Sequence, residues 1–306
     1  MNQLTNKSFQ QAKSFINNQG RELDKKRYEY HFENGSFDAV LEVLTSYQNE
    51  DGGFGHSLEP DLRTTASSAI VTTGAFQIFK EIGVNVDYTI VQKGIEYFLN
   101  TYDENEKVWD IIPPEVENAP HAPWWTYEGN RECFGRYLIN PRVEIVGYLH
   151  DFGGELVSKN WLESLTSDVI NYIISREDDL EMHDLLCCSR LAETENIPDI
   201  DKLWKKIEQS ALKIVAKSPD ELNDYVLKPI WLVTTPSSPL LDILRKEVDM
   251  NLDFEIKQQG EDGSWSPNFS WGDLHPEVWE IAKKEWQSKF TIDTLNTLNE
   301  FGRIEG

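Results

Sequence analysis

Apolar residues recur about every 3.6 positions along most of the chain, and strict alternation of apolar and polar residues is scarce. This spacing places apolar side chains on one face of a helix, so it predicts helices over residues 36–47, 67–82 and 87–99. Ser36 can cap the first of these, and Gly83 stands where a helix commonly ends. Further helices are expected to begin near residues 141, 161, 181, 201, 220, 239 and 276. The pattern therefore predicts an all-α protein of roughly a dozen helices.

The longest interruption of this pattern lies at about residues 110–140, a segment rich in proline and tryptophan. Its prolines make one continuous helix improbable, because proline removes a backbone donor and restricts the residue before it. Connections of this length are commonly lids or binding loops. No Pro-, Gly- or Ser-rich linker divides the chain elsewhere. We therefore expect a single domain over residues 1–306 with one elaborate loop.

The charge of the chain excludes some classes of partner. Its 53 acidic and 29 basic residues give a formal net charge of −24 over 306 residues. Binding to nucleic acid requires a concentrated basic surface, so no nucleic-acid partner is expected. Aromatic residues make up 11% of the chain, including ten tryptophans, which is too rich a composition for a disordered acidic protein.

The same composition indicates a cytoplasmic protein. No apolar run approaches the roughly 18 residues that a transmembrane helix requires, so no transmembrane segment is expected. The first residues are polar and lack the apolar stretch of a secretory signal. Cys133, Cys187 and Cys188 cannot all pair, and two of them are neighbours, which is typical of a protein in a reducing compartment.

A short motif recurs along the chain. Residues 47–55 read Tyr-Gln-Asn-Glu-Asp-Gly-Gly-Phe-Gly, and residues 257–265 read Lys-Gln-Gln-Gly-Glu-Asp-Gly-Ser-Trp. We align Gln48 with Gln258, and a weaker copy ends at Trp109. The spacing of the aromatic ends favours units of about 52 residues, hence close to six helical hairpins. In such a unit the Gln caps exposed backbone groups, Asp-Gly forms the turn, and the aromatic ring packs one hairpin on the next.

A Gln followed by Asp-Gly-Gly-Phe or Asp-Gly-Ser-Trp after an aromatic-rich helix resembles the QW repeat of squalene and oxidosqualene cyclases. Protein prenyltransferase β-subunits share that architecture. The resemblance implies an α/α toroid, in which an inner ring of helices lies inside an outer ring around an axial cavity. It also implies an enzyme of the terpenoid cyclase and prenyltransferase type.

The motifs that carry chemistry in those relatives do not occur here. The chain has no Asp-x-Asp-Asp, no correctly spaced Asp-Asp-x-x-Asp and no Asp-x-Cys zinc ligands. His183 and Cys187 stand four residues apart, as two metal ligands on one helical face would. A third ligand is not evident nearby, so the cysteines are explained more simply as small buried residues.

Polar residues gather directly after the first motif, in residues 56–63 (His-Ser-Leu-Glu-Pro-Asp-Leu-Arg). Glu59 and Asp61 are candidate catalytic residues, because carboxyl groups in different environments can divide acid and base roles. His56 and Arg63 are candidate substrate-binding residues. His56 and the two carboxylates could also hold a divalent metal. The alternative is a purely structural turn braced by Asp and Arg.

The long loop adds residues 121–125 (His-Ala-Pro-Trp-Trp). His121 is a candidate catalytic residue. Trp124 and Trp125 are candidate substrate-binding residues, because indole rings can wall an apolar pocket and stabilise positive charge through their faces. The alternative is that the loop packs on its own hairpin.

Two candidates stand elsewhere. Glu144 lies in an otherwise apolar helix and must face either a cavity or an arginine, since unpaired burial of a carboxylate is costly. It is therefore a fourth candidate catalytic residue. Trp271 follows the last motif in an aromatic and polar turn and is a candidate substrate-binding residue.

These observations favour an enzyme that acts on a small apolar molecule, such as an isoprenoid, in the axial cavity. The alternatives are a carbohydrate-active lyase or hydrolase that binds an oligosaccharide, and a non-catalytic binding protein. Residues 56–63 and 121–125 each follow a repeat-type aromatic in consecutive hairpins, so we expect them to meet at one end of the ring. That would gather two imidazoles, two carboxylates and two indoles around one opening.

Overall fold

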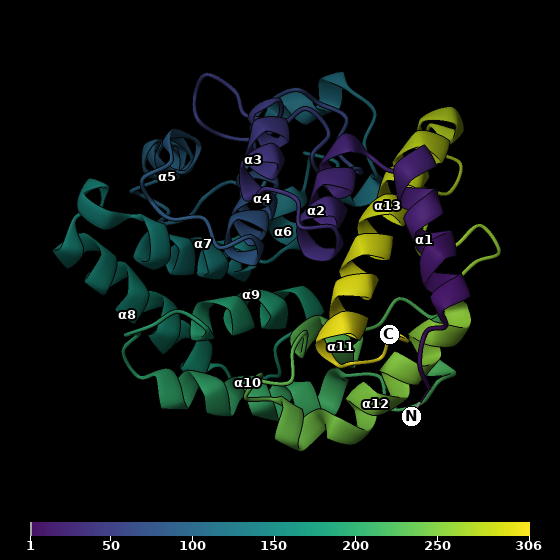
Figure 1. The fold of residues 1–306 in the computed structure, drawn as a ribbon. Coiled ribbons are helices and arrows are strands. Elements are labelled where there is room, and N and C mark those ends of the chain that lie inside the picture. Colours follow the sequence, from purple (N-terminus) through teal and green to yellow (C-terminus); the bar gives the residue numbers. More distant parts are fainter. Residues whose placement is uncertain (1) are drawn as a thin grey trace. The chain divides into compact units, whose positions relative to one another are not determined.

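The computed structural model describes residues 2–306, and its regular secondary structure is helical (Figure 1). The all-α expectation is confirmed, because no strand occurs in the described range and only isolated β-bridges do. The ring arrangement of a toroid stays a prediction. The α-helices are α1 (Asn6–Gln19), α2 (Glu22–Phe32), α3 (Phe37–Thr45), α4 (Ala69–Glu81), α5 (Thr89–Thr101), α6 (Asn130–Cys133), α7 (Ile139–Phe152), α8 (Lys159–Ser175), α9 (Met182–Ala192), α10 (Ile200–Ile214), α11 (Pro229–Leu232), α12 (Leu241–Gln258) and α13 (Pro276–Glu300).

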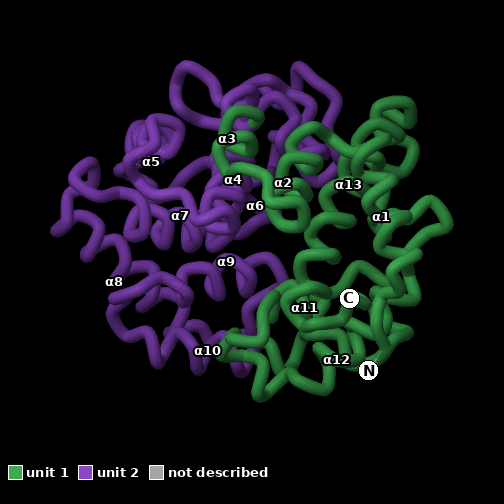
Figure 2. The backbone as a smooth tube through the Cα atoms, viewed as in Figure 1, with its two compact units in different colours: residues 1–43, 211–306 green, residues 44–210 purple. Residues whose placement is uncertain are grey.

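The helices group into two compact units (Figure 2). Unit 2 is one continuous stretch, residues 44–210, whereas unit 1 combines residues 1–43 with residues 211–306. The chain passes from one unit to the other within α3 and again within α10. That the chain is a single domain stays a prediction.

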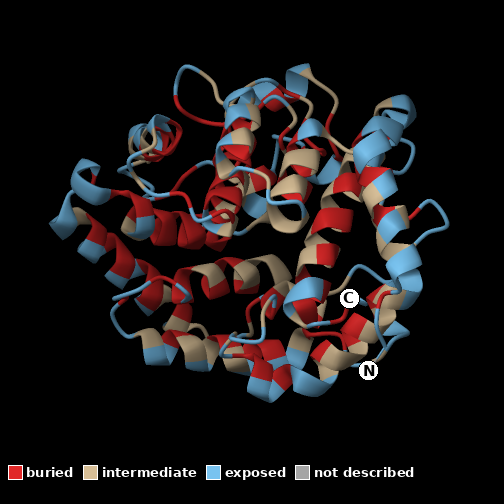
Figure 3. Cartoon of the chain, in the orientation of Figure 1, coloured by how far each residue is buried: buried red, intermediate tan, exposed pale blue. Residues whose placement is uncertain are grey.

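Unit 2 is built around α7, which packs against α4, α5, α8 and α9. Residues 139–149 of α7 are all buried, so this helix is coloured as buried along most of its length in Figure 3. Phe76 of α4 lies at the centre of an aromatic cluster, with its ring 5.2 Å from that of Tyr148 and 5.5 Å from that of Phe152. Aromatic side chains of α4 and α7 therefore pack together in the interior of unit 2.

Unit 1 joins the two ends of the chain. Leu4 forms a parallel bridge with Ile304, and the backbone N–H of Leu4 donates to the carbonyl of Arg303 (2.7 Å). Helices α1 and α2 both pack against α13, and α1 runs beside α13 in Figure 1. Helix α12 packs against α11 in the same unit.

Local signals in the sequence set several helix ends. The Ser68 side chain accepts from the N–H of Val71 and caps α4, and Gly83 follows the end of that helix with φ +70°. The Glu181 side chain caps α9 in the same way, by accepting from the N–H of Asp184. These caps explain why α4 and α9 begin within about two residues of their predicted starts.

The proline-rich segment holds only short helices, namely the 3-10 turns Pro114–Asn118 and Pro123–Trp125 and the four-residue α6. None of the helices in residues 2–306 combines the length and the apolar character needed to cross a bilayer.

Candidate functional site

The first motif copy is a turn fastened to a helix that follows later in the chain. The side-chain amide of Gln48 donates to the carbonyl of Gly52 (2.9 Å) inside the turn and to that of Ile90 (2.8 Å) in α5. Gly52 has φ +87°, and a Cβ atom there would lie 2.1 Å from the carbonyl oxygen of Lys93. Only glycine fits this contact, so the motif presses its backbone directly on α5.

The second copy repeats this arrangement in unit 1, but one residue away from the alignment that we expected. Gln259, not Gln258, donates to the carbonyl of Gly263 (2.9 Å) and to that of Ser8 in α1 (2.9 Å). Gly263 has φ +92°, and a Cβ atom there would lie 2.4 Å from the carbonyl oxygen of Gln11. The alignment of Gln258 with Gln48 was therefore wrong, and Gln259 occupies the structural position.

The aromatic residue of each copy is also held in a similar way. The N–H of Phe54 donates to the Thr72 hydroxyl (3.0 Å), and that of Trp265 donates to the Thr291 hydroxyl (3.2 Å). The indole of the weaker copy, Trp109, is fully buried and donates to the Phe98 carbonyl (2.6 Å). The motif thus builds the fold, as its residue types indicated.

Residues 56–63, called the 56–63 turn below, lie beside residues 121–125, the 121–125 loop. Leu62 pairs with His121 in an antiparallel bridge. The N–H of Arg63 donates to the carbonyl of Pro120 (3.1 Å), and the N–H of Ala122 donates to that of Asp61 (3.0 Å). The two segments that we expected to meet are therefore joined backbone to backbone, and together they are called the composite site.

The candidate side chains of the 56–63 turn differ in exposure. Asp61 is buried (2% exposed), Glu59 and Arg63 are half-buried, and His56 is exposed. The Arg63 guanidinium donates to the carbonyl of Pro60 (3.3 Å), so this side chain helps to hold the turn. Two carboxyl groups in such different surroundings meet the condition for dividing acid and base roles.

His121 is 9% exposed, and its ring is oriented by the backbone. Its Nδ1 lies 2.9 Å from the carbonyl oxygen of Ala119, which can only accept, so Nδ1 carries the proton. In the neutral ring, Nε2 is then the accepting nitrogen, and Glu117 Oε1 lies 4.0 Å from it. Glu117 is held in turn by the N–H of Tyr127 (2.6 Å). This carboxylate was not among the predicted site residues, although it stands four residues before His121.

The aromatic residues that follow His121 in the sequence differ in exposure. Trp124 is 39% exposed and Tyr127 is 41% exposed, whereas Trp125 is 7% exposed and stacks on Phe134 at 5.5 Å. The indole N–H of Trp125 is buried and has no hydrogen-bond partner in the described residues. Trp124 can therefore contact a ligand directly, and Trp125 is better placed to support the loop.

Glu144 lies in a different neighbourhood, the interface of α7 and α9. It is 1% exposed, and its Oε2 accepts from Arg190 (2.7 Å) and from Gln77 (3.4 Å). The expected alternatives were a cavity or an arginine, and the structure has the arginine. The catalytic role of Glu144 stays a prediction, because neither of these partners belongs to the composite site.

The remaining candidates have other partners. Trp271 belongs to unit 1, where it is 2% exposed and packs 5.8 Å from Trp279. His183 contacts Glu181 (3.3 Å), while the Cys187 thiol points to the side-chain oxygen of Asn140 (3.5 Å). In residues 2–306 no group of three or more His, Cys, Asp and Glu side chains is arranged to hold a metal ion.

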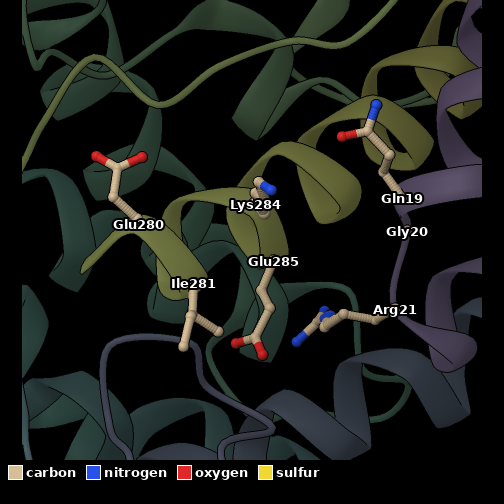
Figure 4. A pocket seen from close by; sticks show the side chains of 7 residues that line it. All are labelled: Gln19, Gly20, Arg21, Glu280, Ile281, Lys284 and Glu285. Carbon is tan, nitrogen blue, oxygen red and sulfur yellow. The ribbon is translucent and has the colours of Figure 1, made fainter. Parts of the chain in front are cut away.

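A pocket of about 410 Å³ lies in unit 1 (Figure 4). Its walls come from the end of α1, the turn into α2 and one face of α13. Charged groups of both signs surround an isoleucine that is 53% exposed, so no single class of ligand is indicated. The lining residues are Gln19, Gly20, Arg21, Glu280, Ile281, Lys284 and Glu285.

One residue that contacts the composite site was missed by the sequence reasoning. The Oδ1 atom of Asn49 accepts from Nε2 of His56 (2.8 Å). The sequence contained a signal for this residue. Where the first motif copy has the polar Asn49, the second copy has Gly260, so the turn itself does not require a polar side chain there.

No protein-family model, curated protein or solved structure matches this chain. The relationship to terpenoid cyclases and prenyltransferases therefore stays a prediction. The function has to be argued from the side chains of the composite site.

Proposed function

We propose that the chain is an enzyme that moves protons on a small, largely apolar molecule bound at the composite site. The observation that carries this proposal is the backbone pairing of Leu62 with His121. It joins the segment that carries Glu59 and Asp61 to the segment that carries His121 and Trp124.

The proposed reaction is an isomerisation of a carbon–carbon double bond, as an isoprenoid would offer. An acid of the site gives a proton to one alkene carbon. A base then removes a proton from a carbon next to the cation, and the electron pair of that C–H bond forms the new double bond. Glu59, Asp61 and His121 are among the groups within the site that can exchange protons. The face of the Trp124 ring can stabilise the cation that exists between the two steps.

A C15 isoprenoid alcohol incubated with the protein in D₂O tests this proposal. We expect an isomer that carries one deuterium on carbon, detected by mass spectrometry, because the donated proton comes from an acid that exchanges with solvent. Glu59→Gln and His121→Ala should each lower the rate by about 100-fold or more. Their melting temperatures should stay close to that of the wild type.

Binding is tested with a matched pair of aromatic variants. Trp124→Ala should weaken binding of the alcohol, followed by calorimetry. Tyr225→Ala removes an exposed ring (50%) of unit 1 and should not weaken it. Equal binding by both variants, together with no deuterated product from the wild type, would contradict the proposal.

A second candidate is a carbohydrate-active enzyme, and one observation favours it. Trp124 and Tyr127 have exposed rings, and the backbone N–H of Tyr127 donates to the half-exposed carboxylate of Glu117. Aromatic faces and a carboxylate thus stand in one segment, as in sites where a sugar ring stacks on an aromatic face. The same calorimetry with an oligosaccharide in place of the alcohol decides between the two substrates.

A further inference from the structure

The orientation of the Asn49 side chain is fixed by its neighbours. Its Nδ2 atom lies 2.9 Å from the carbonyl oxygen of Thr65 and 2.9 Å from the hydroxyl of Ser67. A carbonyl oxygen can only accept, so the atom that faces Thr65 must be the amide nitrogen. The other end of the side chain is then the oxygen Oδ1, and this is the atom that faces His56.

The tautomer of His56 follows from this orientation. Oδ1 of Asn49 can only accept, and it lies 2.8 Å from Nε2 of His56, so Nε2 carries the proton. In the neutral ring Nδ1 then has the free electron pair. The Ser67 hydroxyl completes the chain of hydrogen bonds by donating to Oδ1 of Asp51 (2.8 Å). These hydrogen bonds form one continuous chain, called the relay below, through Asp51, Ser67, Asn49 and His56.

The backbone holds His56 in an uncommon conformation. His56 has φ +53° and Ser57 has φ +64°, so two successive residues with side chains occupy the left-handed region. Each such residue costs about 1–2 kcal/mol, and the conformation persists only where its surroundings enforce it. The surroundings here are the Asn49 contact before His56 and the pairing of Leu62 with His121 after it.

The second motif copy lacks this relay although it keeps the turn. Gly260 stands where the first copy has Asn49, and Asp262 accepts from the hydroxyl of Ser264 within its own turn (2.8 Å). The fold-building contacts of the motif therefore do not require the relay. It is an addition that is confined to the copy beside the composite site.

We propose that His56 is the base of the reaction proposed above, with Nδ1 as the accepting atom, and that Asn49 is its positioning residue. The substrate C–H bond breaks, the proton moves to Nδ1, and the electron pair stays on the substrate as its new double bond. The imidazolium that forms keeps its hydrogen bond from Nε2–H to the Asn49 oxygen, whose partial negative charge stabilises the positive ring. The proton then passes from Nδ1 to solvent. This inference rests on the proposed function.

The tautomer is tested first, without any substrate. Long-range ¹H–¹⁵N correlation spectra of histidine-labelled protein distinguish the two neutral forms, and the signals that disappear in His56→Asn assign this ring. We expect only the Nε2–H form in the wild type. Asn49→Ala should introduce a measurable Nδ1–H fraction, whereas Ser67→Ala should not, because Thr65 still orients Asn49. A wild-type ring protonated at Nδ1 would overturn the positioning role.

The role as base is tested with the C15 alcohol in D₂O. His56→Asn should lower kcat by about 100-fold, and Asn49→Ala by about tenfold with KM changed less than about twofold. Asparagine tolerates positive φ, so the fold should persist. His275→Asn is the matched control, because His275 also has positive φ (+45°) and lies in unit 1.

The two proposals fail in different ways. If His56→Asn keeps its rate while Glu59→Gln and His121→Ala lose theirs, the base assignment is wrong and the proposed function stands. If the wild type forms no deuterated isomer, the proposed function and the base role both fail, and the tautomer spectra still report on Asn49.

Discussion

The two good copies of the motif, at residues 48–54 and 259–265, are the same turn used in two different ways. In both, a glutamine amide joins the turn to a separate helix, and a glycine with positive φ touches that helix. Beyond the turn they diverge. The first copy leads into the 56–63 turn with its relay and carboxyl groups, whereas the second leads into a cluster of aromatic rings around Phe269. The shared contacts belong to the fold, and the side chains present in only one copy are where chemistry should be sought.

The largest expected effect comes from the glycine of each turn. Gly52→Ala and Gly263→Ala should each destabilise the protein by about 3–5 kcal/mol, because left-handed strain is added to a clash with a helix backbone. Gly83→Ala and Gly272→Ala are the controls, since both have positive φ and open space. They should cost only about 1–2 kcal/mol. Urea denaturation measures all four, and equal losses would show that the turn does not press on its helix.

The glutamines should give an intermediate effect. Gln48→Ala and Gln259→Ala should each cost about 1–3 kcal/mol, because two carbonyl groups lose a donor. Gln258→Ala is a neighbouring control on an exposed side chain and should stay within about 0.5 kcal/mol. A larger loss for Gln258→Ala than for Gln259→Ala would restore the alignment made from sequence.

The smallest expected effect is on how stability depends on pH. One aspartate in each unit contributes to this dependence, and the two contributions have opposite signs. In unit 2, burial and the neighbouring Glu181 raise the pKa of Asp184 to about 7. The folded state then holds this proton more tightly than the unfolded state, so stability falls as pH rises from about 4 to 7. Asp184→Asn should stabilise the protein by about 1–2 kcal/mol above pH 7, since solvent screens part of the charge. The gain should vanish near pH 4 in denaturation curves.

In unit 1 the balance is reversed. Burial acts to raise the pKa of Asp293, but Lys289 and Arg27 outweigh it, and the pKa is lowered. The stability from this group is present above its unfolded pKa and is lost as pH falls through the folded value. Asp293→Asn should therefore destabilise the protein at neutral pH. Denaturation curves in which both Asn variants shift in the same direction at pH 8 would remove this contrast between the units.

The helices with local signals were predictable from sequence, and those stabilised by distant partners were not. Ser68 and Gly83 mark the ends of α4 within a few residues of its apolar stripe. Helix α1 has a cap, because the Thr5 side chain accepts from the N–H of Ser8, but few of its residues are apolar, and it packs against α13, more than 250 positions later. The helix expected near residue 220 is only a three-residue 3-10 turn, Glu221–Asn223.

The candidate site was predictable in its backbone but not in its hydrogen bonds. The meeting of the 56–63 turn with the 121–125 loop followed from their equivalent places after two repeat aromatics. The partner of Glu144 could not be read from sequence, because Arg190 lies 46 positions away. Asn49 was overlooked because asparagine in a turn is explained by turn formation alone.

The construction of unit 1 from both ends of the chain has a consequence for biosynthesis. A ribosome synthesises residues 44–210 before residues 211–306, which contain most of the partners of residues 2–43. Unit 2 can therefore begin to fold before unit 1 is complete. Leu4 must then pair with Ile304, about 300 positions later, and closing so long a loop makes this a slow step. In the meantime the apolar residues of the nascent N-terminal segment, Phe15 and Ile16 among them, remain uncovered and open to chaperone binding.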